Sequence, residues 1–288
     1  MASENHIENP FEFFIEKLGW AASDAAHLAL PKLSRHAGQA APVVRRITIA
    51  DLWAALREGA ADVAATRDDI LFIGLIYPLA GLLLARLVFS LDLLPLIFPL
   101  AAGFALIGPF AAIGLYELSR RREQGLPVSW LNGFDVFHSP SIGSILGLGA
   151  IMLALFLVWL GVAYEIYLAT IGGTAPQTVA AFEASLFTTG GGWTMIAAGL
   201  GVGFLFAVLA FALSVVSFPL LLDRDVGLTS AIATSLRAVR ENPGVMIVWG
   251  AIVAGLLVLG SLPALVGLIF VVPLLGHATW RLYRRLIG

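Results

Sequence analysis

The chain has 288 residues, of which 59% are hydrophobic and only 12% are charged. A soluble globular domain carries about 25% charged residues, so a water-soluble protein of this size could not cover its surface with so few charges. The composition therefore predicts a polytopic membrane protein. A net charge of −2 gives no electrostatic basis for nucleic-acid binding. The absence of cysteine excludes disulfides, thiolate metal sites and a cysteine nucleophile.

The N-terminal section is more polar than the rest, and we expect residues 1–44 to be a cytoplasmic leader before a transmembrane domain at 45–288. Its acidic start lacks the basic and apolar pattern of a signal peptide, which favours a cytoplasmic N-terminus. Helical spacing predicts one apolar face in the leader, formed by Phe11, Phe14, Ile15 and Leu18. Because Glu12 and Glu16 occupy the polar side, this face suits a protein partner, or the protein's own cytoplasmic surface, better than an anionic leaflet.

Six apolar stretches are long enough to cross a bilayer, since about 20 helical residues span roughly 30 Å. They lie near residues 70–90, 93–116, 142–169, 194–222, 244–261 and 264–282. Only Ser261-Leu262-Pro263 separates the last two stretches. Their joined run would be too long for a single crossing, so we expect a hairpin there.

The distribution of Lys and Arg predicts the orientation. With the N-terminus inside, 16 of the 17 basic residues fall in cytoplasmic segments, and the three outer connections carry none. The exception is Arg86, within the first stretch. We therefore expect a bacterial inner-membrane protein with both termini in the cytoplasm.

An internal repeat is visible in the sequence. PFAAIGLYELSRR, starting at Pro109, is similar to PLLGHATWRLYRR, starting at Pro273, and both end in paired arginines. Repeats of this kind are common in membrane folds. The predicted fold class is thus all-α, with six transmembrane helices arranged as three repeated hairpins and joined by short cytoplasmic amphipathic helices.

Two of these amphipathic helices have clear starts. Thr48 and Asp51 form a capping box. The apolar stripe predicted after it consists of Ile49, Leu52, Leu56 and Val63. A second stripe, after Thr229, consists of Ile232, Leu236 and Val239. Within the spans, small residues four apart, such as Gly199 and Gly203 or Gly250 and Ala254, predict close helix packing.

Ionisable residues at membrane depth are candidates for function because an unpaired charge in hydrocarbon is costly. Arg86 and Glu165 lie at similar depths near the outer side, and Asp92 lies at the first outer turn. One interpretation is an outward-facing polar site that binds a substrate or a proton. The other is an ion pair that stabilises helix packing, or an arginine that extends to the outer headgroups.

Two histidines, His138 and His277, lie on the predicted cytoplasmic side and are candidates for a polar site there. No H-x-x-x-H or E-x-x-H pairing supports haem or metal ligation. A hydrogen bond within the helix bundle is the alternative for His277. The sequence leads us to expect no catalytic, cofactor-binding or metal-binding residues.

Several segments carry a resemblance to a known family. They are Arg45-Arg46-Ile47-Thr48, the amphipathic segment ending Arg67-Asp68-Asp69, LYELSRRR at 115–122, LLLDR at 220–224 and ATSLRAVRENP at 233–243. Together they resemble an uncharacterised bacterial family of predicted integral membrane proteins, some members of which are labelled cytochrome c oxidase subunits. The resemblance covers roughly residues 45–285 and implies no catalytic residues.

The oxidase label can be compared with the histidines present. A catalytic haem–copper subunit needs several histidines within its membrane helices, whereas this chain offers His277 and the interfacial His138. The sequence therefore favours a non-catalytic scaffold or accessory protein, for which a respiratory complex is a candidate partner besides the lipid bilayer. The alternative is a transporter or binder of a small apolar or lipid-like molecule.

Overall fold

The computed structural model describes residues 42–65, 112–172, 178–263 and 265–288, together with positions 79, 81, 82, 86, 96, 99 and 100. These residues all belong to one unit, Ala41–Gly288. Its regular elements, as far as they are described, are helices: α2 (Ile49–Ala65), α5 (Ile113–Glu123), the 3₁₀-helix η3 (Trp130–His138), α6 (Ile142–Thr170), α7 (Val179–Thr188), α8 (Gly190–Ser214), α9 (Ser217–Asp223), α10 (Leu228–Glu241), α11 (Pro243–Ser261) and α12 (Leu268–Leu286). The only β-type pairing among them is an isolated bridge between Val44 and Ile287.

Three helical segments are long and apolar enough to cross a membrane: α6, α8 continued through α9, and α11. They coincide with the predicted stretches 142–169, 194–222 and 244–261, so the all-helical membrane class is confirmed. The predicted stretch 70–90 and most of 93–116 lie outside the described residues. The predicted stretch 264–282 corresponds largely to α12, which is not among the three because its last turns carry Arg281, Arg284 and Arg285.

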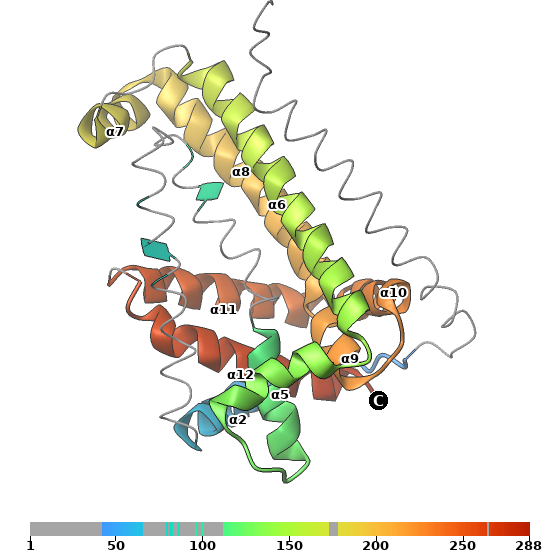
Figure 1. Ribbon diagram of the computed structural model, residues 1–288. Coiled ribbons are helices and arrows are strands. Elements are labelled where there is room, and N and C mark those ends of the chain that lie inside the picture. The colour runs from blue at the N-terminus through green and yellow to red at the C-terminus, as the bar shows by residue number, and fades with distance from the viewer. Residues whose placement is uncertain are drawn as a thin grey trace, which may run out of the picture. The chain divides into compact units, whose positions relative to one another are not determined.

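Helices α6 and α8 lie side by side, and α7 lies at the far end of the pair (Figure 1). The buried seam of α6 follows helical spacing and consists of Ile145, Leu148, Met152, Trp159, Ala163 and Tyr167. A Cβ atom on Gly203 of α8 would come within 3.0 Å of the Trp159 ring, so the close packing predicted for Gly203 is seen. Such an atom on Gly199, the other member of the predicted pair, would have no described atom within 4 Å. Large apolar side chains such as Leu200 and Phe204 remain exposed, as expected of a surface that faces lipid.

The break between α8 and α9 has a side chain inserted into it. The Ser235 hydroxyl donates to the Ala212 carbonyl at 2.7 Å and accepts from the Val216 amide at 3.2 Å. In a continuous helix that amide and that carbonyl would bond to each other. Ser235 of α10 therefore satisfies both backbone groups and anchors α10 to the break.

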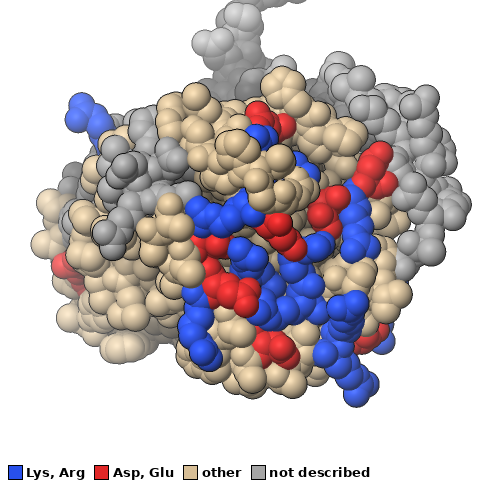
Figure 2. Space-filling view, turned by 90° about the horizontal axis from the view of Figure 1, so that it is seen from below, with Lys and Arg blue, Asp and Glu red and all other residues tan. Residues whose placement is uncertain are grey.

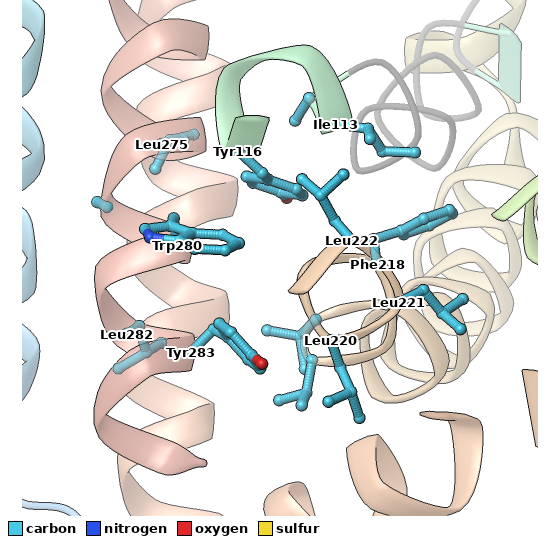
Figure 3. Packing of buried hydrophobic residues seen from close by; sticks show 14 of the residues in the cluster. Ile113, Tyr116, Phe218, Leu220, Leu221, Leu222, Leu275, Trp280, Leu282 and Tyr283 are labelled. Atoms are coloured by element: carbon cyan, nitrogen blue, oxygen red, sulfur yellow. The ribbon is translucent and has the colours of Figure 1, made fainter. Parts of the chain in front are cut away.

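The other end of the α6–α8 pair carries α5, α9 and α10 (Figure 1). Trp280 and Tyr283 of α12 point toward α9, whose Leu220 and Leu222 point back, and Tyr116 of α5 lies beside them (Figure 3). These side chains are buried, so this end is a packed core rather than a set of loose loops.

The amphipathic helices form where predicted, but their buried faces match the predicted stripes only in part. Leu52 is buried, and Leu56, Ile232 and Val239 pack partly buried against the core, while Leu236 is exposed. The capping box of α2 is confirmed: the Thr48 amide donates to Asp51 Oδ2 at 2.8 Å, and the Asp51 amide donates to Thr48 Oγ1 at 3.3 Å. The buried face of α2 consists of Leu52, Ala55, Gly59 and Asp62, while Ile49 is exposed. The buried face of α10 consists of Ala231, Thr234, Ser235 and Ala238. Small residues are buried because they let neighbouring helices approach closely.

Candidate functional site

Charged side chains gather on the face of the molecule seen from below in Figure 2, where basic and acidic residues alternate. We call the core of this group the arginine–carboxylate cluster. It consists of Glu58, Asp62, Glu123 and Asp223 with Arg122, Arg281, Arg284 and Arg285. The acids come from α2, α5 and α9, and three of the four arginines come from the last turns of α12.

Asp62 is the most buried acid of the cluster, with 5% of its surface exposed. Arg281 donates to both of its carboxylate oxygens, from Nε to Oδ2 at 2.9 Å and from Nη2 to Oδ1 at 3.0 Å. Arg122 donates from Nη1 to the backbone carbonyl of Asp62 at 2.7 Å and to Oδ1 at 3.2 Å. One acid of α2 thus holds both α5 and α12.

The next turn of α12 contacts two further acids. Arg284 donates to Glu123 Oε1 at 3.0 Å and to Asp223 Oδ2 at 3.3 Å. Trp280 Nε1 donates to Glu123 Oε2 at 3.1 Å, and the Tyr283 hydroxyl donates to Asp223 Oδ2 at 2.6 Å. Burial, together with the hydrogen bond to Asp223, raises the pKa of Tyr283, so this phenol stays protonated as a donor.

At the exposed edge of the cluster, Arg285 donates to Glu58 from Nη2 to Oε1 at 2.6 Å and from Nη1 to Oε2 at 3.2 Å. The Arg285 hydrogen bond lowers the pKa of Glu58 below its ordinary value. Glu117 of α5 is almost fully buried and binds Arg120 of its own helix through both oxygens, at 2.7 and 2.8 Å. Both Glu58 and Glu117 are thus bound by an arginine side chain through two hydrogen bonds.

His277 is buried in α12 beside Ser119 of α5, and its Nδ1 atom lies 2.6 Å from the Ser119 hydroxyl. Its Nε2 atom is buried without a hydrogen-bond partner among the described residues. His138, by contrast, is exposed at the end of η3. The two histidines therefore lie in different environments. His277 makes a hydrogen bond within the helix bundle, which was the second of the two interpretations of this residue.

The other predicted site residues are placed as follows. Arg86 and Glu165 are both exposed, Glu165 on α6, and their pairing stays a prediction. Asp92 lies outside the described residues, as does the leader face of Phe11, Phe14, Ile15 and Leu18. In the part of the chain that the structure describes, no three histidine or carboxylate side chains are grouped as metal ligands.

The two ends of the described chain also meet near this cluster. The Arg45 amide donates to the Leu286 carbonyl at 2.7 Å, next to the bridge between Val44 and Ile287. Asn242, a buried residue between α10 and α11, accepts from the Ile47 amide at 2.8 Å and donates to the Arg45 carbonyl at 3.1 Å. The segment before α2 is therefore fixed against both the C-terminus and the start of α11.

Sequence reasoning identified the paired arginines but not their partners. The repeat at Pro109 and Pro273 marked the basic ends of α5 and α12, whereas nothing local marked Asp62 or Asp223 as their acids. Asp62 lies off the predicted apolar stripe of α2, so the periodicity of the sequence gave no signal for it. Asp62 follows Gly59 at a spacing of three, on the face that α12 covers.

Chemically, the cluster joins helices. Each acid of the cluster is bound by the guanidinium group of an arginine on another helix. Glu123 also accepts a hydrogen bond from the Trp280 indole, and Asp223 accepts one from the Tyr283 phenol. Such charge-assisted hydrogen bonds are strong and directional. The arrangement is suited to fixing α12 against α2, α5 and α9.

Comparison with known proteins identifies one family. Residues 97–223, which include α5, η3 and α6 to α9, match the family described as "Predicted integral membrane protein (DUF2189)". No curated protein and no solved structure matches the chain. The resemblance inferred from the sequence is therefore confirmed over residues 97–223, the region that matches this family of predicted integral membrane proteins.

Proposed function

We propose that the protein is a non-catalytic scaffold or accessory protein of the bacterial inner membrane, which engages a membrane complex, with a respiratory complex as the first candidate. The observation that carries this proposal is the arginine–carboxylate cluster. Its acids hold helices together across α2, α5, α9 and α12. A carboxylate fixed in this way serves structure better than proton transfer or substrate binding.

We propose further that the chain crosses the membrane six times as three hairpins, with both termini in the cytoplasm. The supporting observation is that the cluster and α7 lie at opposite ends of the α6–α8 pair (Figure 1). Arginines are retained on the cytoplasmic side of a membrane, which favours a cytoplasmic position for the cluster. Helix α7, whose one charged residue is Glu183, would then lie outside.

The topology can be tested with single cysteines, because the chain contains none of its own. Glu183→Cys on α7 and Gln124→Cys at the end of α5 both place the thiol at an exposed position. An impermeant maleimide added to intact spheroplasts should label position 183, and should label position 124 only after lysis. The reverse pattern would refute the orientation.

The scaffold role is tested by purifying the tagged full-length chain from native membranes in a mild detergent and identifying associated proteins by mass spectrometry. We expect stoichiometric subunits of one membrane complex. The purified chain should also fail to accelerate the movement of fluorescent lipid analogues across liposome membranes. Lipid movement by the purified chain, without a stable complex, would establish the transporter alternative.

A further inference from the structure

The 3₁₀-helix η3 presents three different faces, because a 3₁₀-helix has three residues per turn and positions i, i+3 and i+6 therefore align. One face consists of Trp130, Gly133 and Val136, of which Val136 is buried and the other two are half-buried. A second is polar and consists of Asn132, Asp135 and His138. The third is apolar, and its side chains are exposed: Leu131 (56%), Phe134 (51%) and Phe137 (65%).

The first two faces fix η3 against the protein. Gly133 lies against Gly114 of α5, where an added Cβ on either glycine would be 3.4 to 3.6 Å from the other's backbone. Arg121 of α5 donates to Asp135 Oδ2 at 2.9 Å, and Asn132 donates to the same oxygen at 3.0 Å. The third face therefore points away from α5 as a preformed surface.

The exposed face is also ordered within itself. The Phe134 and Phe137 rings are stacked with centroids 6.5 Å apart, and the Trp130 ring meets Phe134 edge-on at 6.1 Å. Three large apolar side chains in a row are unfavourable in water by roughly 1.5–3 kcal/mol for each one that could be fully buried. A surface built in this way requires something to cover it.

The position of η3 indicates what covers it. Exposed apolar residues of α6 begin at Leu146 and extend to Leu168, a length of about 33 Å along the helix, which matches the hydrocarbon thickness of a bilayer. His138, the last residue of η3, precedes Ile142, the first of α6, by four residues, or at most about 14 Å of chain. The apolar face of η3 thus lies only a few residues along the chain from the start of the exposed apolar surface of α6.

From this geometry we propose that η3 lies in the membrane interface, with Leu131, Phe134 and Phe137 inserted at the boundary between the headgroups and the acyl chains. Helices that lie in the membrane interface bury faces of Trp, Phe and Leu at this boundary. The one acid of η3, Asp135, is paired with Arg121 and turned toward α5, so it does not repel an anionic leaflet. The rigid η3 would then set the depth and tilt of α6.

The test uses single cysteines carrying the fluorophore NBD, in the full chain reconstituted into phosphatidylethanolamine–phosphatidylglycerol liposomes. Phe134→Cys and Phe137→Cys report on η3, and Leu131→Cys replaces either of them if its variant does not fold. Gln124→Cys is the control in water, and Leu200→Cys, an exposed position in α8, is the control deep in the bilayer. Quenchers are nitroxides at carbon 5 or carbon 12 of the lipid chain, and aqueous iodide.

We expect labels at 134 and 137 to be quenched at least twofold more strongly by the carbon-5 nitroxide than by the carbon-12 nitroxide. They should also be several-fold less sensitive to iodide than the label at 124. Iodide sensitivity equal to that at 124 would overturn the proposal. Protection from both iodide and lipid nitroxides would overturn it as well, because protein rather than lipid would then cover the face.

Discussion

Asp62 shows how one residue can connect three helices. It is buried in α2 and receives hydrogen bonds from Arg122 of α5 and Arg281 of α12. Removing one partner of a buried ion pair is expensive, because the charges left behind lose their compensation. The exposed pair between Glu58 and Arg285 joins the same two helices, α2 and α12, but in water its attraction is screened. The two acids are therefore a matched pair for mutation.

We predict that Asp62→Asn lowers the free energy of unfolding by about 3 kcal/mol, the low end of the range for such losses. The low end applies because Arg122 and Arg281 keep 25% and 21% of their side-chain surfaces exposed. Glu58→Gln should lower it by less than about 1 kcal/mol. Both losses can be measured from unfolding curves recorded in detergent micelles by circular dichroism. Equal losses would contradict the assigned role of Asp62.

The pair between Glu58 and Arg285 also predicts a pH dependence. Because hydrogen bonding to Arg285 lowers the pKa of Glu58 in the folded protein below 4.5, the pair stabilises the fold fully above pH 4.5. This stabilisation is lost as the pH falls through the lower, folded pKa. Between pH 6 and pH 3, the melting temperature of the unmutated chain should therefore fall further than that of Glu58→Gln. Parallel melting curves over this range would refute the pairing.

At the scale of elements, α12 is the helix that organises the polar end. Its first half is apolar. Its second half contacts α2, α5 and α9 through apolar side chains and through arginines. The contact with α2 is close because Gly59 faces the backbone of Ala278, where an added Cβ would lie 2.7 Å from the nearest atom. Among the other glycines, Gly250 of α11 has no described atom within 4 Å of such a Cβ, so the packing predicted for it is not seen.

Alanine substitutions at these two glycines should have opposite effects. Gly59→Ala should destabilise the protein by about 1–3 kcal/mol, because the new methyl group meets backbone that cannot move aside easily. Gly250→Ala should be neutral or stabilising by up to about 1 kcal/mol, since alanine favours the helix and no described residue crowds this position. Melting temperatures in the same detergent give the signs. If both substitutions destabilised the protein, the loss of glycine's backbone flexibility, rather than the packing around each residue, would explain the effects.

At the scale of the whole molecule, the start of the described chain is tied to its end. Val44 is bridged to Ile287, Arg45 bonds to Leu286, and Asn242 binds the backbone on both sides of Arg46. The predicted leader 1–44 therefore overlaps by four residues, 41–44, with the unit Ala41–Gly288 that contains α2 to α12. A deletion that tests the leader should end before Pro42.

We predict that deleting residues 1–41 leaves an inserted, folded domain, because the contacts of Val44 and Arg45 are retained. The deletion should nevertheless remove co-purification of the membrane complex, since the apolar leader face of Phe11, Phe14, Ile15 and Leu18 goes with it. The matched control is the full-length chain with Phe11 and Phe14 replaced by serine, which should show the same loss. Undiminished co-purification in both variants would assign partner binding to another surface.

Much of this protein follows from its sequence alone. The membrane class, the positions of α6, α8, α9 and α11, and the capping box of α2 are all readable, because hydrophobicity and helix signals are local along the chain. The predicted stripe of α2 was partly wrong for a related reason. Periodicity shows which side of a helix is apolar, but a neighbouring backbone that requires glycine decides which side is buried.

Only the tertiary structure decided the partners of the charged residues and the exposed face of η3. Asp62 and Arg281 are 219 residues apart, and no local pattern links an acid in one helix to an arginine so distant in the chain. The residues of η3 repeat every three positions rather than every 3.6, a period that reads as irregular loop in a sequence. The sequence therefore determines which segments are helical and apolar, and the packing of distant segments determines which charges are paired and which apolar face is left for the membrane.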